Sequence, residues 1–331
     1  MNLINKNDRI FIAGHTGMVG GAIKRLFENL GYKNLITPSR KDLNLADQKK
    51  VEDWFKENKP DVVILAAAKV GGIIANENYS GDFILENLKI EINVIENSWK
   101  NNVKRFLFIG SSCIYPKFAE QPIKEEYLLS GDLEKTNESY SIAKIAGIKL
   151  CSALKKQYNF DAISLMPTNL YGPGDNYHSI NSHVFPSLIK KFYNAKKKDL
   201  PFVTCWGTGS PRREFLYVDD LAQAVIFALE NISSDNKVLF DKYSNYLGII
   251  NVGIGLDIPI NELAQIIASE VNFKGQIIWD KSKPDGTPRK ILNSSKIHKL
   301  GWKANTHIKK GIALTLKDYI ENKNNNTLRC V

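Results

Sequence analysis

The feature that most constrains this chain is a glycine-rich turn near its start. Residues 9 to 14 form an apolar run that ends in glycine, which is typical of a buried parallel strand. Gly14, Gly17 and Gly20 follow at a spacing of three, and residues 21 to 30 have helical apolar spacing. This order predicts a dinucleotide site in which backbone amides at the helix start bind a pyrophosphate. A purely structural turn between a strand and a helix is the alternative.

The residues after the next apolar run indicate which dinucleotide is bound. Residues 34 to 37 predict the second strand, and Pro38, Ser39 and Arg40 follow it. An NAD enzyme usually places Asp or Glu here, about 20 residues past the turn, where it binds the ribose 2′-hydroxyl. A hydroxyl and a guanidinium suit a 2′-phosphate instead, so the sequence favours NADP(H). A surface arginine with no role in binding is the alternative.

Strand and helix patterns alternate through the first half of the chain. Further buried strands are predicted over residues 61–68, 104–110 and 161–166, each with a continuous apolar run. Helical patterns lie between them, and the longest covers residues 83–101. This alternation predicts the α/β fold class, with a Rossmann-type doubly wound parallel sheet and right-handed crossovers.

The second half is less regular, because Pro, Gly and Asn recur throughout residues 172–216. Shorter strand and helix patterns follow, which predict a smaller mixed α/β C-terminal lobe that binds the substrate. The predicted domains are a dinucleotide-binding domain over 1–170 to which about 217–255 return, a substrate lobe mainly over 171–320, and a frayed tail over 321–331.

Three polar residues in the first domain are candidates for acid–base chemistry. Tyr140 and Lys144 are four residues apart in a helical pattern, which places both side chains on one helix face. A nearby cation favours a phenolate, so the pair could exchange protons with a substrate. Ser111 directly follows the strand over 104–110, at the sheet edge where ligands bind in open α/β folds. A chance pair on a solvated helix face is the alternative for Tyr140 and Lys144.

Together, the glycine turn, Ser111 and the Tyr140–Lys144 pair resemble the extended branch of the short-chain dehydrogenase/reductase superfamily, which acts on nucleotide sugars. Longer motifs are similar to those of the GDP-L-fucose synthase family, and the resemblance covers the chain from Arg9 to about Trp302. These motifs lie at residues 66–72, 110–117, 136–138, 143–151, 166–173, 181–184, 206–209, 213–216 and 283–290.

The resemblance implies an NADPH-dependent enzyme that epimerises C3 and C5 of a GDP-4-keto-6-deoxy sugar and reduces its C4 keto group. Tyr140 would donate a proton to the C4 oxygen, and Ser111 would bind the same oxygen. Lys144 would lower the pKa of Tyr140 and hold the nicotinamide ribose. Cys113 and His183 would exchange the protons at C3 and C5. A small buried cysteine and a loop histidine without a role are the alternatives for these two.

The resemblance also assigns the binding residues. The predicted cofactor site comprises Gly14, Thr16, Gly17, Met18, Val19, Gly20, Ser39, Arg40, Asp47, Leu65, Ala66, Ala67, Lys144, Pro167, Asn169 and Leu170. The predicted substrate site comprises Ser111, Cys113, Tyr140, Asn169, His183, Lys191, Trp206, Arg213 and Asp285. Thr16 and Lys191 depart from the family, whose members often have arginine at both positions. An enzyme that only reduces C4, on a GDP-6-deoxy-4-keto-heptose or hexose in surface-glycan precursor synthesis, therefore remains the alternative.

Composition bears on partners and location. The net charge of +10 is spread along the chain, so a phosphate-bearing small molecule is expected and a nucleic acid is not. There is no run of about 18 apolar residues and no signal-peptide pattern, so a cytoplasmic protein without a membrane partner is expected. The four cysteines lack disulfide or zinc spacing, and no metal is expected.

The family implies a homodimer through helices near 83–101 and 140–157. A non-catalytic dinucleotide sensor is the alternative class of protein.

Overall fold

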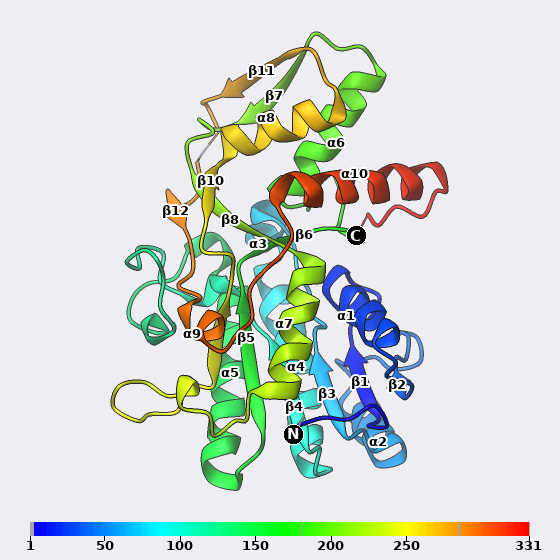
Figure 1. Cartoon of the computed structure of the whole chain (residues 1–331), viewed down its shortest axis with the longest axis vertical. Helices are drawn as coiled ribbons and strands as arrows, with labels where there is room; N and C mark the ends of the chain where they lie inside the picture. Colours follow the sequence, from blue (N-terminus) through cyan, green and yellow to red (C-terminus); the bar gives the residue numbers. More distant parts are fainter. Residues whose placement is uncertain (1–2, 180, 284, 331) are drawn as a thin grey trace.

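The computed structural model describes residues 3–179, 181–283 and 285–330. Within these residues the core is a six-stranded sheet whose neighbouring strands all run parallel. Its strands in spatial order are β2 (Leu35–Ile36), β1 (Ile10–Ala13), β3 (Val62–Leu65), β4 (Arg105–Ile109), β5 (Ala162–Pro167) and β9 (Ile249–Val252). The predicted doubly wound parallel sheet is confirmed (Figure 1).

Side chains alternate between the two faces of this sheet, and helices cover both faces. One face is covered by α1 (Met18–Asn29) and α7 (Val218–Asn231). The other is covered by α2 (Gln48–Asn58), α4 (Ser80–Lys100) and α5 (Glu138–Tyr158). The strand register aligns Ile12, Ile64, Leu107 and Ile163 in one fully buried row on the first face. Continuous apolar strands are therefore needed here, because every strand residue meets one of two cores.

A smaller lobe lies beyond the carboxyl ends of the strands, at the top of Figure 1. Its main elements are α6 (Val184–Lys197), β7 (Phe202–Trp206), α8 (Ile260–Val271), β11 (Gln276–Asp280) and α10 (Ile308–Asn324). A separate aromatic-rich core holds it together, in which the rings of Tyr171 and Phe185 stack with centroids 4.1 Å apart.

A second small sheet connects this lobe to the dinucleotide domain. It comprises β6 (Asn169–Tyr171), β8 (Arg212–Tyr217), β10 (Asp257–Pro259) and β12 (Arg289–Lys290). The remaining short helices are α3 (Ile73–Asn78), η1 (Ser112–Ile114), η2 (Glu125–Tyr127), η3 (Lys135–Asn137), η4 (Lys237–Leu239) and α9 (Ser295–Lys299). The chain passes between the two domains several times. From its second half, β9 joins the edge of the main sheet and α7 covers one face of that sheet.

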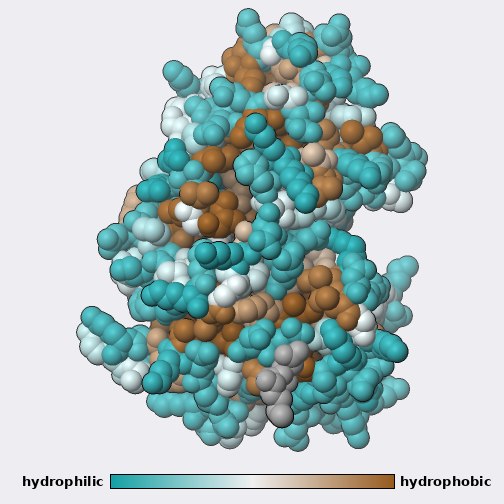
Figure 2. All heavy atoms as spheres, viewed as in Figure 1, coloured by the Kyte–Doolittle hydropathy of each residue, from teal (hydrophilic) through white to brown (hydrophobic). Residues whose placement is uncertain are grey.

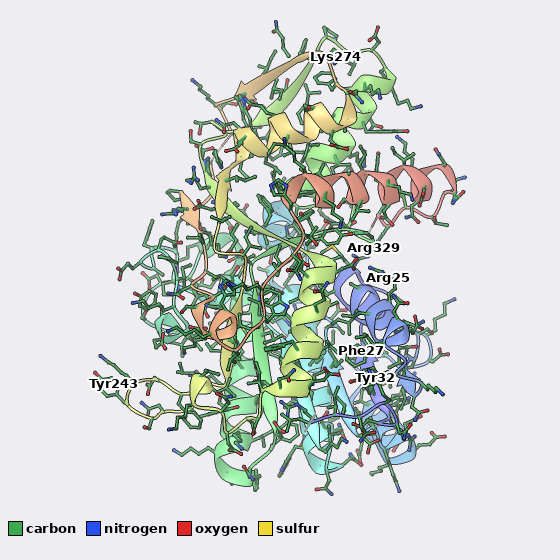
Figure 3. All side chains as sticks on the ribbon, viewed as in Figure 1. Arg25, Phe27, Tyr32, Tyr243, Lys274 and Arg329 are labelled. Carbon is green, nitrogen blue, oxygen red and sulfur yellow. The ribbon has the colours of Figure 1, made fainter. Side chains whose placement is uncertain are left out.

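The described part of the tail, which the sequence predicts to be frayed, has specific contacts with the lobe. Helix α10 continues to Asn324, and the Asn322 side chain bonds both Asp318 and Thr327. The Arg329 carbonyl accepts a hydrogen bond from the Tyr177 backbone N–H at 2.9 Å. Figure 3 shows Arg329 just below α10. The asparagine run therefore forms specific local bonds, which its composition alone did not reveal.

The exterior is mainly hydrophilic on the face drawn in Figure 2, where smaller hydrophobic areas interrupt the polar surface. In the part of the chain that the structure describes, none of the helices combines the length and apolar character needed to span a bilayer.

Candidate active site

The glycine turn between β1 and α1 is closely packed. Gly14 has a φ of +92°, and a Cβ atom there would lie 2.6 Å from the Ala67 backbone nitrogen. A Cβ atom on Gly20 would collide with the Gly14 carbonyl oxygen. These close contacts require glycine at both positions. They hold the turn against the strand end, so that α1 begins at Met18 and not at residue 21 as predicted. Two glycines lower helix propensity, but here they allow the first helical turn to pack against the strand end.

This turn has the properties of a pyrophosphate site. Gly17 is the N-cap of α1, and no side chain caps the first amides of the helix, which include those of Met18 and Val19. Uncapped amides and the helix dipole both favour a bound anion. Ala66 and Ala67 follow β3 beside the turn and leave only methyl groups there. The chain therefore fits a dinucleotide at this edge of the sheet.

The candidate residues for the 2′-phosphate lie after β2. The Arg40 side chain is 76% exposed, and its guanidinium forms an ion pair with Glu86 on α4 at 2.9 Å. Glu86 also pairs with Lys69 at 3.3 Å. Ser39 donates its hydroxyl to Asp42 at 2.6 Å. Asp47 caps α2 by accepting the Lys50 N–H at 3.1 Å, so its side chain already has a structural role.

Ser111, Tyr140 and Lys144 are brought together where β4 ends. Ser111 is the N-cap of η1, and its hydroxyl interacts with the Tyr140 phenol. The Lys144 ammonium lies 6.0 Å from the centroid of the Tyr140 ring. It donates to the Ile109 carbonyl at 3.1 Å and pairs with Glu91 at 3.2 Å. The helix spacing predicted from the sequence therefore places a hydroxyl, a phenol and an ammonium at one strand end.

The pKa of Tyr140 differs from the prediction. Burial is the main cause that raises the pKa of this phenol well above its usual value, and the charges of Cys113 and Glu91 add to the increase. The hydrogen bond to Ser111 opposes it. The family resemblance predicts that the Lys144 ammonium lowers the tyrosine pKa, whereas in the structure this ammonium is directed to Glu91 and Ile109. Tyr140 is therefore held as a neutral phenol, which is the form that can donate a proton.

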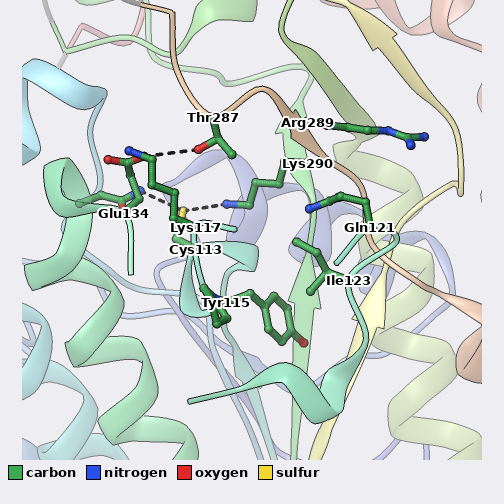
Figure 4. Close-up of a pocket in the computed structure, with 11 residues that line it drawn as sticks. Cys113, Tyr115, Lys117, Gln121, Ile123, Glu134, Thr287, Arg289 and Lys290 are labelled. Carbon is green, nitrogen blue, oxygen red and sulfur yellow. Dashed lines mark hydrogen bonds and ion pairs between the residues drawn. The ribbon is translucent and has the colours of Figure 1, made fainter. Parts of the chain in front are cut away.

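Cys113 lies in a pocket beside this centre. Asn137 donates its side-chain amide to the Cys113 sulfur at 3.4 Å, and the Lys290 ammonium donates to the same atom at 3.5 Å. Figure 4 shows Lys290 directed to the sulfur, with Lys117, Glu134 and other residues around the pocket. The empty space between the lining residues amounts to about 290 Å³, part of which is open to solvent. A thiol with an adjacent ammonium is suited to bear transient negative charge.

His183 is placed separately, as the N-cap residue of α6. Its loop is fixed by a hydrogen bond from the Gly72 N–H to the Asn181 carbonyl at 2.8 Å. Its ring keeps solvent access, yet surrounding protein atoms desolvate it, and this desolvation lowers the pKa of the imidazole. Among the described residues, none of the hydrogen bonds or ion pairs connects His183 to Cys113 or Tyr140. Ser111, Cys113, Tyr140 and Lys144 therefore lie together at the end of β4, and His183 lies at the start of α6.

The predicted substrate residues of the lobe form two groups. Trp206 is 55% exposed at the end of β7, with the Lys191 and Lys283 ammonium groups 5.8 and 5.6 Å from its ring centroid. Burial lowers the pKa of the Arg213 guanidinium, whereas Cys113, Asp285 and Glu134 act in the opposite direction. Arg213 therefore lies within electrostatic range of the Cys113 pocket.

Two predicted binding residues have structural partners. Asp285 accepts hydrogen bonds from the backbone and hydroxyl of Thr208, at 2.9 and 2.7 Å. Asn169 donates its side-chain amide to the Glu214 carbonyl at 2.9 Å, while Pro167 ends β5 and Leu170 lies in β6. The Asp285 bonds join two loops of the lobe, and the Asn169 bond joins β6 to β8.

The sequence prediction missed three residues at the site. Asn137 and Lys290 contact the Cys113 sulfur, and both lie in motifs that carry the family resemblance. Glu91 is the buried partner of Lys144, and it was concealed in the apolar pattern of a long helix. The family motifs therefore offered a signal for the first two residues, and the third had none.

A doubly wound sheet with a glycine turn at one strand end and a serine–tyrosine–lysine group at another defines a dinucleotide-dependent enzyme of the extended short-chain dehydrogenase type. Residues 10–253 match the model of the NAD dependent epimerase/dehydratase family. The chain is 52% identical to a probable GDP-L-fucose synthase 1 of Oryza sativa subsp. japonica, over 97% of this chain and 94% of that protein.

A GDP-L-fucose synthase of Escherichia coli (strain K12) is 51% identical, over 95% of this chain and 97% of that protein. A solved GDP-mannoheptose C4 reductase from Campylobacter jejuni, with NADP bound, is 38% identical, with a TM-score of 0.86 over 96% of this chain and 99% of that one. The chain belongs to the NAD dependent epimerase/dehydratase family, in the branch that contains these GDP-L-fucose synthases.

Proposed function

We propose that this chain catalyses both the 3,5-epimerisation and the C4 reduction of a GDP-4-keto-6-deoxy sugar. It is an NADP-dependent oxidoreductase, as the GDP-L-fucose synthases and the NADP-bound C4 reductase among its relatives support. One observation carries the two-step proposal. Cys113 is two residues after Ser111 on the η1 turn and acts electrostatically on Tyr140, so a proton-exchanging thiol adjoins the reducing centre.

The reductive step needs a proton donor and a group that polarises the carbonyl. NADPH, held at the glycine turn of Gly14, Gly17 and Gly20, would supply a hydride for C4 of the sugar. The Ser111 hydroxyl donates a hydrogen bond to the C4 oxygen, and Tyr140 transfers its proton to that oxygen as negative charge develops. The raised pKa of Tyr140 keeps it protonated before this transfer. Lys144 supplies positive charge at the same helix face.

The epimerising step uses the acidity of the hydrogens beside the 4-keto group. Removal of the C3 or C5 proton gives an enolate, and return of a proton on the opposite face inverts that carbon. Cys113 and His183 are the proposed acid and base for these transfers. The Lys290 ammonium and the Asn137 amide stabilise negative charge on the sulfur during the exchange.

The basic and aromatic residues of the lobe support binding of the nucleotide diphosphate. Trp206 presents an exposed ring to the base, with Lys191 and Lys283 beside it for phosphate charge. Arg213 is within electrostatic range of Cys113 and Asp285, which supports a role in binding the sugar nucleotide. At the other end, Arg40 is the proposed ligand of the cofactor 2′-phosphate.

Deuterium incorporation separates the proposal from C4 reduction alone. Enzyme and GDP-4-keto-6-deoxy-mannose are incubated in deuterated water without NADPH, and the sugar is then analysed by NMR. We expect deuterium at C3 and C5, followed by reduction when NADPH is added. Reduction without prior deuterium incorporation would favour the C4 reductase, whose relative at 38% identity supports it.

Tyr140→Phe should abolish reduction, by about 10²- to 10⁴-fold, and keep the exchange. A sensor protein would show neither reaction.

We also infer a homodimer through α4 and α5. These helices pack against each other, and they expose Leu85, Ile92 and Ile142, which are 55%, 47% and 43% accessible. A second copy could cover these side chains by forming a four-helix bundle.

The proposed substrates and the free thiols Cys113, Cys151, Cys205 and Cys330 support a cytoplasmic location.

A further inference from the structure

A buried carboxylate lies directly behind the reducing centre. Glu91, on α4, is 1% exposed, and its carboxylate pairs with the equally buried Lys144 ammonium at 3.2 Å. Among the described residues, Lys144 is the one cation paired with Glu91. Neither carboxylate oxygen has a neutral hydrogen-bond donor within the described chain. The charges of Glu91 and Lys144 therefore compensate each other.

The neighbouring helix is shaped around this carboxylate. Gly147 on α5 is one turn beyond Lys144, and a Cβ atom there would lie 2.8 Å from Glu91 Oε2 and 2.9 Å from the Phe108 ring. The ring of Phe108 also lies 4.5 Å from the Lys144 ammonium. The glycine thus allows the carboxylate to reach between α4 and α5, and the aromatic ring fixes the depth of the lysine.

The Lys144 ammonium has three N–H donors. One donates to the Ile109 carbonyl at the end of β4, and the ammonium also forms an ion pair with Glu91. The remaining donors can serve the phenol or the nicotinamide ribose. The charge of Glu91 also adds to the effects of burial and Cys113 that raise the pKa of Tyr140. Glu91 therefore influences both partners of the reductive step without contacting the substrate.

We propose that Glu91 is a positioning residue for C4 reduction, which holds the Lys144 ammonium at the end of β4. This inference rests on the proposed function. Cys113 receives its contacts from Asn137 and Lys290, and Glu91 contacts neither of them. Glu91 should consequently serve the reduction and not the epimerisation.

The titratable groups that interact with Glu91 all lie on α5. They are Lys144, Tyr140 and Cys151, and the pKa of the Cys151 thiol is raised mainly by burial and secondarily by Glu91. A change at Glu91 therefore acts on this helix and on the reducing centre that it carries.

A matched control is available elsewhere in the protein. Glu125 in η2 is also buried, at 2% exposed, and also pairs with a lysine, Lys296, at 3.7 Å. It accepts a hydrogen bond from the Asn251 N–H and contacts none of the proposed catalytic residues. Glu125→Gln makes the same chemical change as Glu91→Gln at another buried glutamate, whose partner Lys296 is 20% exposed and is not one of the proposed catalytic residues.

The experiment compares two activities in each full-length variant. NADPH oxidation measures reduction, and deuterium incorporation at C3 and C5 without NADPH measures epimerisation. We expect Glu91→Gln to lower kcat for reduction by about 10- to 100-fold, as part of the general-acid contribution. Its deuterium incorporation should stay near the wild-type rate. Glu125→Gln should leave the ratio of the two activities unchanged.

Several results would overturn the inference. Equal losses of both activities in Glu91→Gln would indicate a structural role, and wild-type reduction would indicate no role. If circular dichroism shows that Glu91→Gln is unfolded, Glu91→Asp carries the test, since it keeps the charge and shortens the reach. We expect a smaller loss of reduction in Glu91→Asp, again with normal exchange. Absence of both activities in the wild type would instead refute the proposed function.

Discussion

Arg40 offers a quantitative test of how the chain selects NADPH over NADH. Its guanidinium is 76% exposed and is paired with Glu86 at 2.9 Å, so binding a 2′-phosphate requires sharing or breaking this pair. A hydrogen bond to a charged group contributes about 1.5–3 kcal/mol, and an exposed ion pair contributes about 0.2–1 kcal/mol. The exposure of Arg40 favours the lower end of the first range.

Arg40→Ala should therefore lower kcat/KM for NADPH by about 10-fold and leave kcat/KM for NADH nearly unchanged. Glu86→Gln should act in the opposite direction, since it releases Arg40, and should raise the NADPH preference by about 1.5- to 5-fold. Both effects should shrink as salt is added, because the groups are exposed. The assay is NADPH or NADH oxidation at saturating sugar nucleotide, at two ionic strengths.

The double variant identifies the route of the Glu86 effect. With Arg40 replaced by alanine, Glu86→Gln should lose most of its benefit, and any remainder measures Lys69, which pairs with Glu86 at 3.3 Å. Equal losses for NADPH and NADH in Arg40→Ala would refute the reasoning, since they would place Arg40 outside the phosphate site. An unchanged NADPH preference would refute it as well.

Three further perturbations test other parts of the site and fold. Gly20→Ala should weaken NADPH binding in a fluorescence titration, because its Cβ collides with the turn, whereas Gly21→Ala, with no atom closer than 3.3 Å, should bind normally. Cys113→Ala should lower deuterium incorporation at C3 and C5 by about 10²-fold or more, and normal incorporation would exclude the thiol. Burial chiefly raises the pKa of Asp175 to about 7, so folding stability is lost as pH rises from the usual carboxyl pKa of 3.8 toward 7. Asp175→Asn should therefore raise the free energy of urea unfolding by about 2–4 kcal/mol at pH 8 and by less at pH 5, whereas an equal gain at both values would contradict this.

The fold could be predicted from the sequence because its signals are local. Each buried strand is a continuous apolar run, and each strand end carries a residue that the fold places at one edge. Ser111 and Tyr140 were identified in this way, since a strand end and a helix face are defined by neighbouring residues. The parallel direction of the strands follows from the alternation of strands and helices.

The contacts that refine the site could not be predicted in the same way. Lys290 reaches Cys113 because β12 pairs with β8, and that pairing has no local signal. Spacing places Lys144 on the same helix face as Tyr140, yet its ammonium is directed by Glu91 on another helix. Asp285 similarly binds Thr208 across the lobe. These arrangements depend on tertiary packing between segments that are distant in sequence.

The late return of β9 and α7 to the main sheet limits how this protein can be divided. A fragment that ends near residue 170 would leave β5 as an unpaired edge and would remove the α7 cover from a fully apolar face. Exposed edges and uncovered apolar faces promote association between chains. The dinucleotide half is consequently not an independently folding domain. Expressing it alone should yield aggregates, even though it contains the glycine turn, Ser111, Tyr140 and Lys144.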